Sequence, residues 1–213
     1  MAHTDSISAE DLIGVWKRQS LQIEGGEPFE VSHAYWLQAH GFYADMRWPR
    51  GEDHRAENSA FAGTADWQAP WMRFAHEIDF NSLITEDVGH LSRENNGLRE
   101  RGELQLGPKT IKFEELWRPV RPKTDNGFVD TSVNVAQLAI DADNRQKGYL
   151  VRIADHAIAM LETGPGVFSA GCWRGESASH WQLLAAIGNH EPLELVLQAV
   201  VSGPVVDGWR TLI

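Results

Sequence analysis

Hydrophobic and polar residues alternate along most of this chain, which is the pattern of strands with one buried face. The clearest run covers residues 111–122, IKFEELWRPVRP. One face of that strand would carry Ile111, Phe113, Glu115 and Trp117. Pro119 and Pro122 cannot donate a hydrogen bond to a neighbouring strand, so the strand must end there. We interpret this run as the last strand of a first, closed sheet.

Upstream of this run, further segments show strand patterns at residues 12–22, 31–38, 42–48, 59–67, 71–80, 87–94 and 98–106. Asn95-Asn96-Gly97 between the last two predicts a β-hairpin. Gly63 inside a strand predicts a bulge or the close approach of another backbone. About eight short strands with short connections predict a sandwich or barrel. An up-and-down barrel of this size has room inside for side chains or one small ligand.

A second β-rich region follows residues 121–128, RPKTDNGF, whose Pro, Asn and Gly predict a domain boundary. Strand patterns resume at 132–140, 148–154, 167–174, 180–187 and 209–213. Residues 157–163 fit a strand or a short helix. Residues 193–202 fit a strand, although residues 191–201 could instead be helical. The predicted fold is all-β and mostly antiparallel with little helix. Residues 1–122 would form an eight-stranded barrel and residues 123–213 a smaller β-barrel-like domain.

Composition narrows the possible partners and cofactors. The 213 residues carry a formal charge of −11, which argues against nucleic acid or an anionic membrane as the main partner. The one cysteine excludes an intramolecular disulfide, and no histidine pair has a convincing ligand spacing, so we expect no metal and no cofactor. The polar N-terminus and the lack of a membrane-length apolar run favour a cytoplasmic protein.

The polar face of residues 42–48 is the first candidate site. Tyr43, Asp45 and Arg47 alternate there, and Arg18 and Glu115 occupy similar faces of other strands. If these faces point inward, their charges must be paired, because an unpaired buried charge is very costly. A guanidinium group in such a cavity can hold the carboxylate or phosphate of a largely apolar ligand. The alternative is that these residues face solvent.

His76 is the second candidate, because it lies among the hydrophobic residues Met72, Phe74, Ile78 and Phe80. A buried histidine can be a general base or a haem ligand. It is more often a core residue bonded to a backbone carbonyl, which is the interpretation that we favour. Cys172, in the sequence GCWRG, fits a small buried thiol better than a nucleophile.

Several short phrases resemble known families. Gly14-Val15-Trp16 resembles the Gly-x-Trp signature of lipocalins and other calycins. The phrases YADMR (43–47), AFAGT (60–64), FEELWRPV (113–120) and GCWRG (171–175) resemble, in the same order, stretches of the fungal HRI family. The resemblance implies two lipocalin-like β-barrel domains. It implies no established chemistry, so no catalytic residue is carried over to this chain.

We expect the first barrel to bind a small apolar or amphipathic molecule that carries an acidic group. The predicted site comprises Trp16, Arg18, Trp36, Tyr43, Arg47, Phe74, His76, Glu115 and Trp117, with Arg47 or Arg18 contacting the acid. Two alternatives remain open: a protein-interaction module with a solid core, and an isomerase, cyclase or lyase working inside the barrel. A solid interior would favour the first alternative, and a cavity with a close histidine–carboxylate pair the second.

Overall fold

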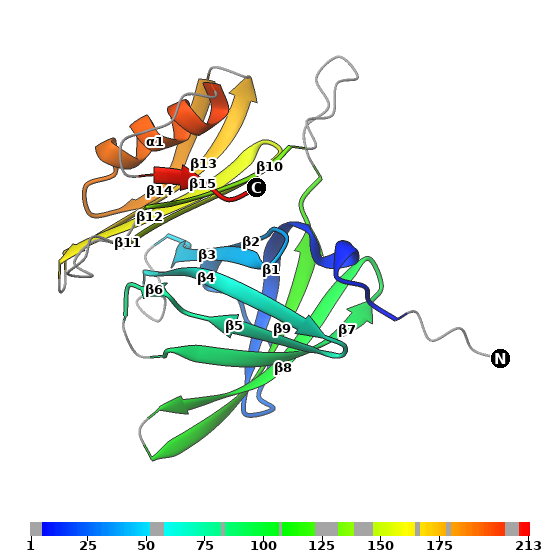
Figure 1. The fold of residues 1–213 in the computed structure, drawn as a ribbon. Coiled ribbons are helices and arrows are strands. Elements are labelled where there is room, and N and C mark those ends of the chain that lie inside the picture. Colours follow the sequence, from blue (N-terminus) through cyan, green and yellow to red (C-terminus); the bar gives the residue numbers. More distant parts are fainter. Residues whose placement is uncertain are drawn as a thin grey trace.

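The computed structural model describes residues 6–51, 58–81, 84–106, 108–121, 132–138, 147–164, 167–177, 180–202 and 209–213. These residues form two antiparallel β-sheets, one α-helix and one short 3-10 turn (Figure 1). The predicted all-β class is therefore confirmed. No helix in the described ranges has the length and apolar character needed to cross a membrane.

The first sheet closes into an eight-stranded barrel. Its strands are β1 (Gly14–Ile23), β2 (Ser32–Gln38), β3 (Phe42–Pro49), β4 (Ser59–Gln68), β5 (Trp71–Ala75), β7 (Glu86–Glu94), β8 (Gly97–Leu106) and β9 (Lys109–Pro119). Each pairs with the next, β1 pairs with β9, and every pairing is antiparallel. The predicted barrel is confirmed, and its last strand ends at Pro119, where a proline was expected to stop it.

The predicted strand at residues 71–80 is broken by a bend, and its second part is the short β6 (Ile78–Asp79), which pairs with β4. Gly63 makes this bend possible. A Cβ atom on Gly63 would lie 2.1 Å from the carbonyl oxygen of Ala75 and 2.9 Å from the amide nitrogen of Glu77. The bend places His76 against the barrel cavity and Ile78 in the core outside the barrel. The prediction that these two residues share a face is therefore wrong.

The second sheet contains β10 (Val133–Leu138), β11 (Lys147–Ile153), β12 (His156–Gly164), β13 (Val167–Ser177), β14 (His180–Ile187) and β15 (Trp209–Thr211). Its order is β14-β13-β12-β11-β10-β15, and within the described ranges no pairing joins its two edges. The prediction of a second barrel is therefore wrong. The sheet needs no closure because both of its faces are covered, one by the first barrel and one by a helix.

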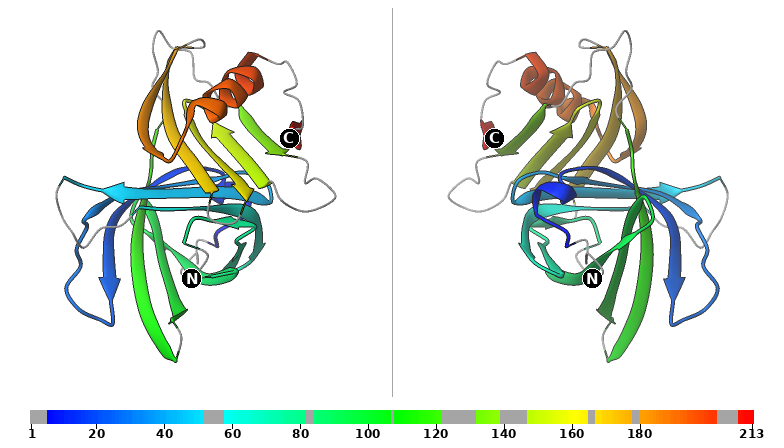
Figure 2. Two further views of the ribbon diagram at one scale, coloured as in Figure 1. Left: turned by 90° about the vertical axis from the view of Figure 1, so that its left-hand side faces the viewer. Right: turned by 90° about the vertical axis from the view of Figure 1, so that its right-hand side faces the viewer.

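Helix α1 (Glu191–Ser202) covers the outer face of the second sheet. Its buried residues Leu193, Val196 and Leu197 follow the spacing of a single helical face. The segment that fitted a strand or a helix is thus helical, whereas residues 156–164, which also fitted both, form a strand. Figure 2 shows the second sheet lying between the helix and the barrel.

One hydrophobic core joins the two sheets. Leu37, Ala44 and Met46 on the outside of the barrel pack with residues such as Val151 and Ile158 of the second sheet. The Tyr149 hydroxyl also donates to Oε2 of Glu77 at 2.6 Å. The outer wall of the barrel on this side is therefore as buried as its interior. The predicted domain boundary after Arg121, at residues 122–128, lies outside the described residues.

Candidate functional site

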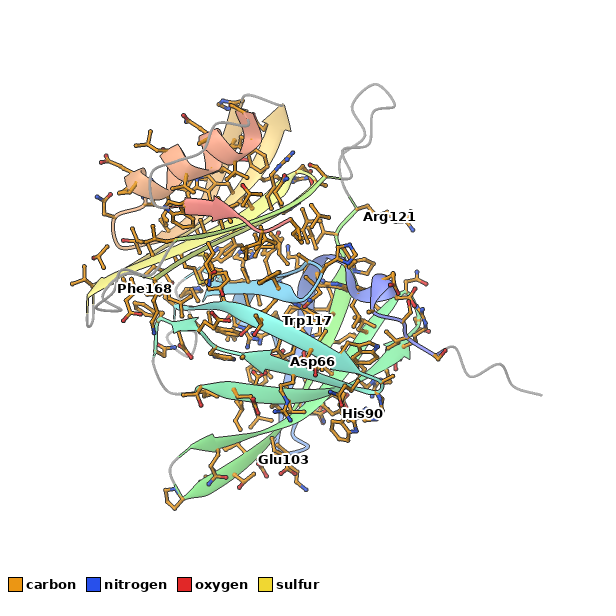
Figure 3. All side chains as sticks on the ribbon, in the orientation of Figure 1. Asp66, His90, Glu103, Trp117, Arg121 and Phe168 are labelled. Carbon is orange, nitrogen blue, oxygen red and sulfur yellow. The ribbon has the colours of Figure 1, made fainter. Side chains whose placement is uncertain are left out.

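One end of the barrel is packed solid. The 3-10 turn at Glu10–Leu12 lies at this end, and Leu12 joins a cluster of buried aromatic and aliphatic side chains. The Trp16 ring stacks on Trp36 with 5.9 Å between ring centroids, and the Trp16 indole donates to the Leu12 carbonyl at 2.8 Å. The Trp117 and Trp36 rings meet edge to face, with 5.7 Å between their centroids. Trp117 is labelled within the barrel in Figure 3. These rings leave no room for a ligand at this end.

The opposite end encloses a cavity of about 200 Å³. Its apolar rim is formed by Leu21, Ile23, Ile84, Leu104 and Phe113. Its polar base is formed by Arg47, Ser59, His76, Asp79, Asp87, Glu100 and Glu115, with Phe61 among them, and Asn81 lines it as an exposed residue. A second space of about 20 Å³ lies deeper, against Trp36, Tyr43, Phe74 and Trp117. The interaction-module alternative required a solid interior, and the interior of the barrel is not solid.

Glu115 is the centre of a buried ion-pair network that spans three strands of the barrel. It accepts hydrogen bonds from Nη1 of Arg18 and, at 3.1 Å, from Nη1 of Arg47. Arg18 also donates to Glu30 at 2.9 Å, and Arg47 to Asp45 at 2.9 and 3.2 Å. The hypothesis that these charges face inward is confirmed. Both guanidinium groups, however, are already paired with carboxylates of the protein.

Two carboxyl groups sit directly opposite each other on β8 and β9, and their environments push their pKa values apart. Burial alone would raise the pKa of Glu115, but the charges of Arg47 and Arg18 hold it below its usual value. Glu100 is the cross-strand neighbour of Glu115 and accepts a 2.9 Å hydrogen bond from the Trp117 indole. Burial and the charge of Glu115 raise the pKa of Glu100 well above its usual value. Of the two, Glu100 is therefore the carboxyl group that holds its proton more strongly.

His76 lies between two carboxylates in the cavity wall. Its Nδ1 is 3.0 Å from Oδ2 of Asp79, and its Nε2 is 3.5 Å from Oδ2 of Asp87. The ring also stacks on Phe61, with 4.5 Å between centroids. Burial lowers the pKa of His76, but the hydrogen bond with Asp79 and the neighbouring charge of Asp87 outweigh burial and raise it to about 9. The imidazole is thus a cation held by carboxylates, and the expected backbone-carbonyl partner is wrong.

The predicted site residues divide into three groups. Arg47, His76 and Glu115 line the larger cavity. Four aromatic residues of the predicted site lie deeper, around the smaller space: Trp36, Tyr43, Phe74 and Trp117. Trp16 belongs to the packed end, and Arg18 contacts Glu115 without lining either space.

Sequence reasoning missed several residues of the cavity, above all Asp79, Asp87 and Glu100. Glu100 could have been found, because it alternates with Leu98 and Leu104 on the same strand face. Asp87 could have been found in the same way, because it alternates with the buried Leu91 on β7 and lies opposite Phe74. Asp79 gave no such signal, since its place in the site depends on the bend after β5. Within the described part of the chain, no three His, Cys, Asp or Glu side chains are arranged to hold a metal ion.

Among solved structures, the uncharacterised protein YLR301w from Saccharomyces cerevisiae matches with a TM-score of 0.65 and 17% identity, over 83% of this chain and 86% of that one. Such low identity shows the fold alone, and the predicted relation to lipocalins stays a prediction. None of the curated proteins compared with the chain matches it. The model of the family described as Protein HRI1 matches residues 14–205, which include strands of both sheets, and the chain therefore belongs to the HRI1 family.

Proposed function

We propose that the cavity at the open end of the barrel binds a small amphipathic molecule. One observation carries this proposal: within a barrel that is packed solid at one end, the other end holds a cavity with a polar base and an apolar rim. Ligand sites commonly combine apolar walls with a few placed polar groups. An eight-stranded barrel has room for one small ligand when side chains do not fill it.

The size of the cavity limits the ligand. The cavity volume is about 200 Å³. The ligand is therefore smaller than the molecules that occupy typical drug-sized pockets of about 300–1,000 Å³. Its polar end lies near His76 and Asp87, and its apolar end contacts Leu104 and Phe113 at the rim.

The proposal does not retain the acidic group that the sequence analysis expected on the ligand. That expectation depended on Arg47 or Arg18 being available to an anion. Arg18 is bound by Glu30 and Glu115, and Arg47 is bound by Asp45 and Glu115. A ligand carboxylate would have to compete with these buried ion pairs, whose separation is costly.

The test uses a panel of neutral, acidic and basic fragments of no more than about ten non-hydrogen atoms. Binding is followed by the indole N–H signals of the ¹⁵N-labelled protein, with the Trp117 signal assigned from the Trp117→Phe variant. The Trp117 indole donates to Glu100, which lines the cavity, so a ligand in the cavity should move this signal saturably. At least one fragment is expected to do so.

A matched pair of variants locates the binding. Leu104→Trp places a large ring at the rim of the cavity and should abolish the shift of the Trp117 signal. Gln105→Trp introduces the same ring one residue later, on the exposed outer face, and should leave the shift unchanged. The proposal fails if no fragment moves the Trp117 signal, or if both folded variants respond like the wild type.

Acid–base catalysis is the second candidate function, because the cavity contains a close histidine–carboxylate pair. The 3.0 Å contact between His76 and Asp79 holds the imidazole in place, and Nε2 faces the cavity next to Asp87. At neutral pH a histidine with a pKa near 9 is protonated, so it would act as a general acid and not as a base. The Tyr43 phenol, whose pKa burial raises, also keeps its proton.

Binding and catalysis are separated by recovering the bound fragment. Each fragment that enters the cavity is incubated with the protein and analysed by mass spectrometry and by proton–deuterium exchange at its carbon atoms. A chemical change or exchange that disappears in a folded His76→Gln variant, while binding persists, would favour catalysis. Unchanged recovery of every bound fragment would leave binding as the function.

A further inference from the structure

The charges around the cavity are not balanced. In the described residues, the carboxyl groups in or directly behind its wall are Glu30, Asp45, Asp79, Asp87, Glu100 and Glu115. The cationic groups that face them are Arg18, Arg47 and His76. Even without Glu100 and Asp45, whose pKa values burial raises, the remaining carboxyl groups outnumber the cationic groups. A cleft lined mainly by one sign of charge attracts ligands of the opposite sign.

Two polar atoms at the base of the cavity have no hydrogen-bond partner: Nε2 of His76 and Oδ1 of Asp87. The His76 side chain is only 2% exposed and lines the cavity, and its Nε2 has Oδ2 of Asp87 as its neighbour at 3.5 Å. Oδ1 of Asp87 is thus a buried carboxylate oxygen without a donor. Leaving such an atom unpaired is costly, and a donor supplied by a ligand would remove that cost.

The two arginines do not offer the cavity an equivalent site for an anion. Each guanidinium group is held by two carboxylates, and Arg47 is also placed over the rings of Phe61 and Trp117, at 5.3 and 5.9 Å. The unpartnered polar atoms at the base are therefore Nε2 of His76, a donor that faces Asp87, and Oδ1 of Asp87, an acceptor of the carboxylate.

We infer that the cavity is selective for a small cationic ligand, an ammonium or amidinium group on a compact apolar body, whose nitrogen donates to Oδ1 of Asp87. This inference rests on the proposed function, because it names the class of ligand that the same cavity binds. The cation adds the positive charge that the wall lacks, and the apolar body lies against the rim at Leu104 and Phe113.

Three probes of nearly identical shape test the charge of the ligand: benzamidine, benzamide and benzoate. At pH 7 their head groups are cationic, neutral and anionic on the same phenyl ring. Isothermal titration calorimetry gives their affinities, and the Trp117 indole signal shows whether they enter the cavity. Benzamidine should bind at least about tenfold more tightly than benzamide, the range expected for a hydrogen bond between charged groups. Benzoate should bind most weakly.

Asp87→Asn isolates the proposed contact. It keeps the shape of the side chain and removes the charge, so benzamidine affinity should fall by at least about tenfold while benzamide affinity stays within about threefold. Glu103→Gln is the matched control, because Glu103 also lies in the barrel wall but its side chain is 59% exposed on the outer face. This control should leave all three affinities unchanged. Circular dichroism confirms that each variant is folded.

Each outcome decides the inference. Tightest binding of benzamidine, lost in Asp87→Asn and blocked by Leu104→Trp, supports it. Equal or tighter binding of benzamide or benzoate, blocked by Leu104→Trp, overturns the inference but leaves the proposed function intact. If none of the three probes binds, the inference is also overturned, and the fragment panel then decides the proposed function. If Asp87→Asn does not fold, the ranking of the three probes on the wild type is decisive.

Discussion

Glu100 and Glu115 face each other inside the barrel, and we predict that neutralising them has opposite effects on stability. Glu115→Gln removes the charge that the buried guanidinium group of Arg18 and the partly buried guanidinium group of Arg47 share. Breaking a buried ion pair by removing one partner costs about 3–5 kcal/mol. The loss of two hydrogen bonds between charged groups, each of about 1.5–3 kcal/mol, gives a similar range. Glu115→Gln should therefore destabilise the fold severely.

Glu100→Gln should be at least as stable as the wild type at pH 7. Burial and the charge of Glu115 raise the pKa of the native carboxyl group, so folding disfavours its charged form, and the amide oxygen of glutamine can still accept from the Trp117 indole. Because the pKa of Glu100 is higher in the folded chain, the folded state binds the proton more tightly. The wild type thus loses about 1.4 kcal/mol per pH unit between the unfolded and folded pKa values. Glutamine avoids this loss, so the advantage of the variant should grow as the pH rises from the unfolded pKa of Glu100 towards its raised pKa in the folded chain.

Urea unfolding followed by tryptophan fluorescence measures both effects. With a slope of about 3 kcal/mol per M, Glu115→Gln should lower the midpoint by about 1–2 M. The exposed control Glu103→Gln should stay within about 0.5 kcal/mol of the wild type. Equal destabilisation by Glu100→Gln and Glu115→Gln, at an unchanged slope, would refute the reasoning that the two carboxyl groups differ in protonation.

Three further predictions concern the residues that position the cavity. The pKa of His76 is raised on folding, so the protonated imidazole stabilises the fold by about 3 kcal/mol. This contribution is complete below about pH 6.5 and is lost as the pH rises through about 9. In urea titrations, the difference in stability between the wild type and His76→Gln should therefore shrink across that pH window. Gly63→Ala should lower the free energy of unfolding by about 1–3 kcal/mol, because the added methyl group collides with a backbone carbonyl. Gly164→Ala is the control in thermal unfolding, because a methyl group there has no neighbouring atom within 4 Å. Tyr149→Phe removes the hydrogen bond to Glu77 between the two sheets and should cost about 1–3 kcal/mol; an unchanged melting temperature would contradict this.

Local pattern sufficed to predict the strands of the barrel. Period-two alternation marks a strand wherever one face is buried, and the Asn95-Asn96-Gly97 turn fixes the β7–β8 hairpin. These patterns involve only a few consecutive residues, so they can be recognised without knowledge of the rest of the fold. Gly63 was likewise recognised as a point of close backbone approach, although its neighbour across the bend was not.

Local sequence did not decide whether the second sheet closes into a barrel. It also did not decide whether residues 191–202 form a helix. The second sheet buries one face on the barrel and the other under α1, so it is stable as an open sheet. Its sequence nevertheless shows the same short strands and turns as a barrel would. The alternation of residues alone cannot distinguish an element that covers another layer from one that closes on itself.

The inside of the barrel was also decided only by tertiary structure. On β3 the hydrophobic residues Ala44 and Met46 face outward, because the second sheet covers them, and the polar residues Asp45 and Arg47 face inward. A hydrophobic face therefore did not mark the interior of the barrel. The sequence determined which residues share a face of each strand. Arg18 and Glu115 are 97 residues apart and meet only because the barrel closes. Their burial is tolerated because each charge then has a partner.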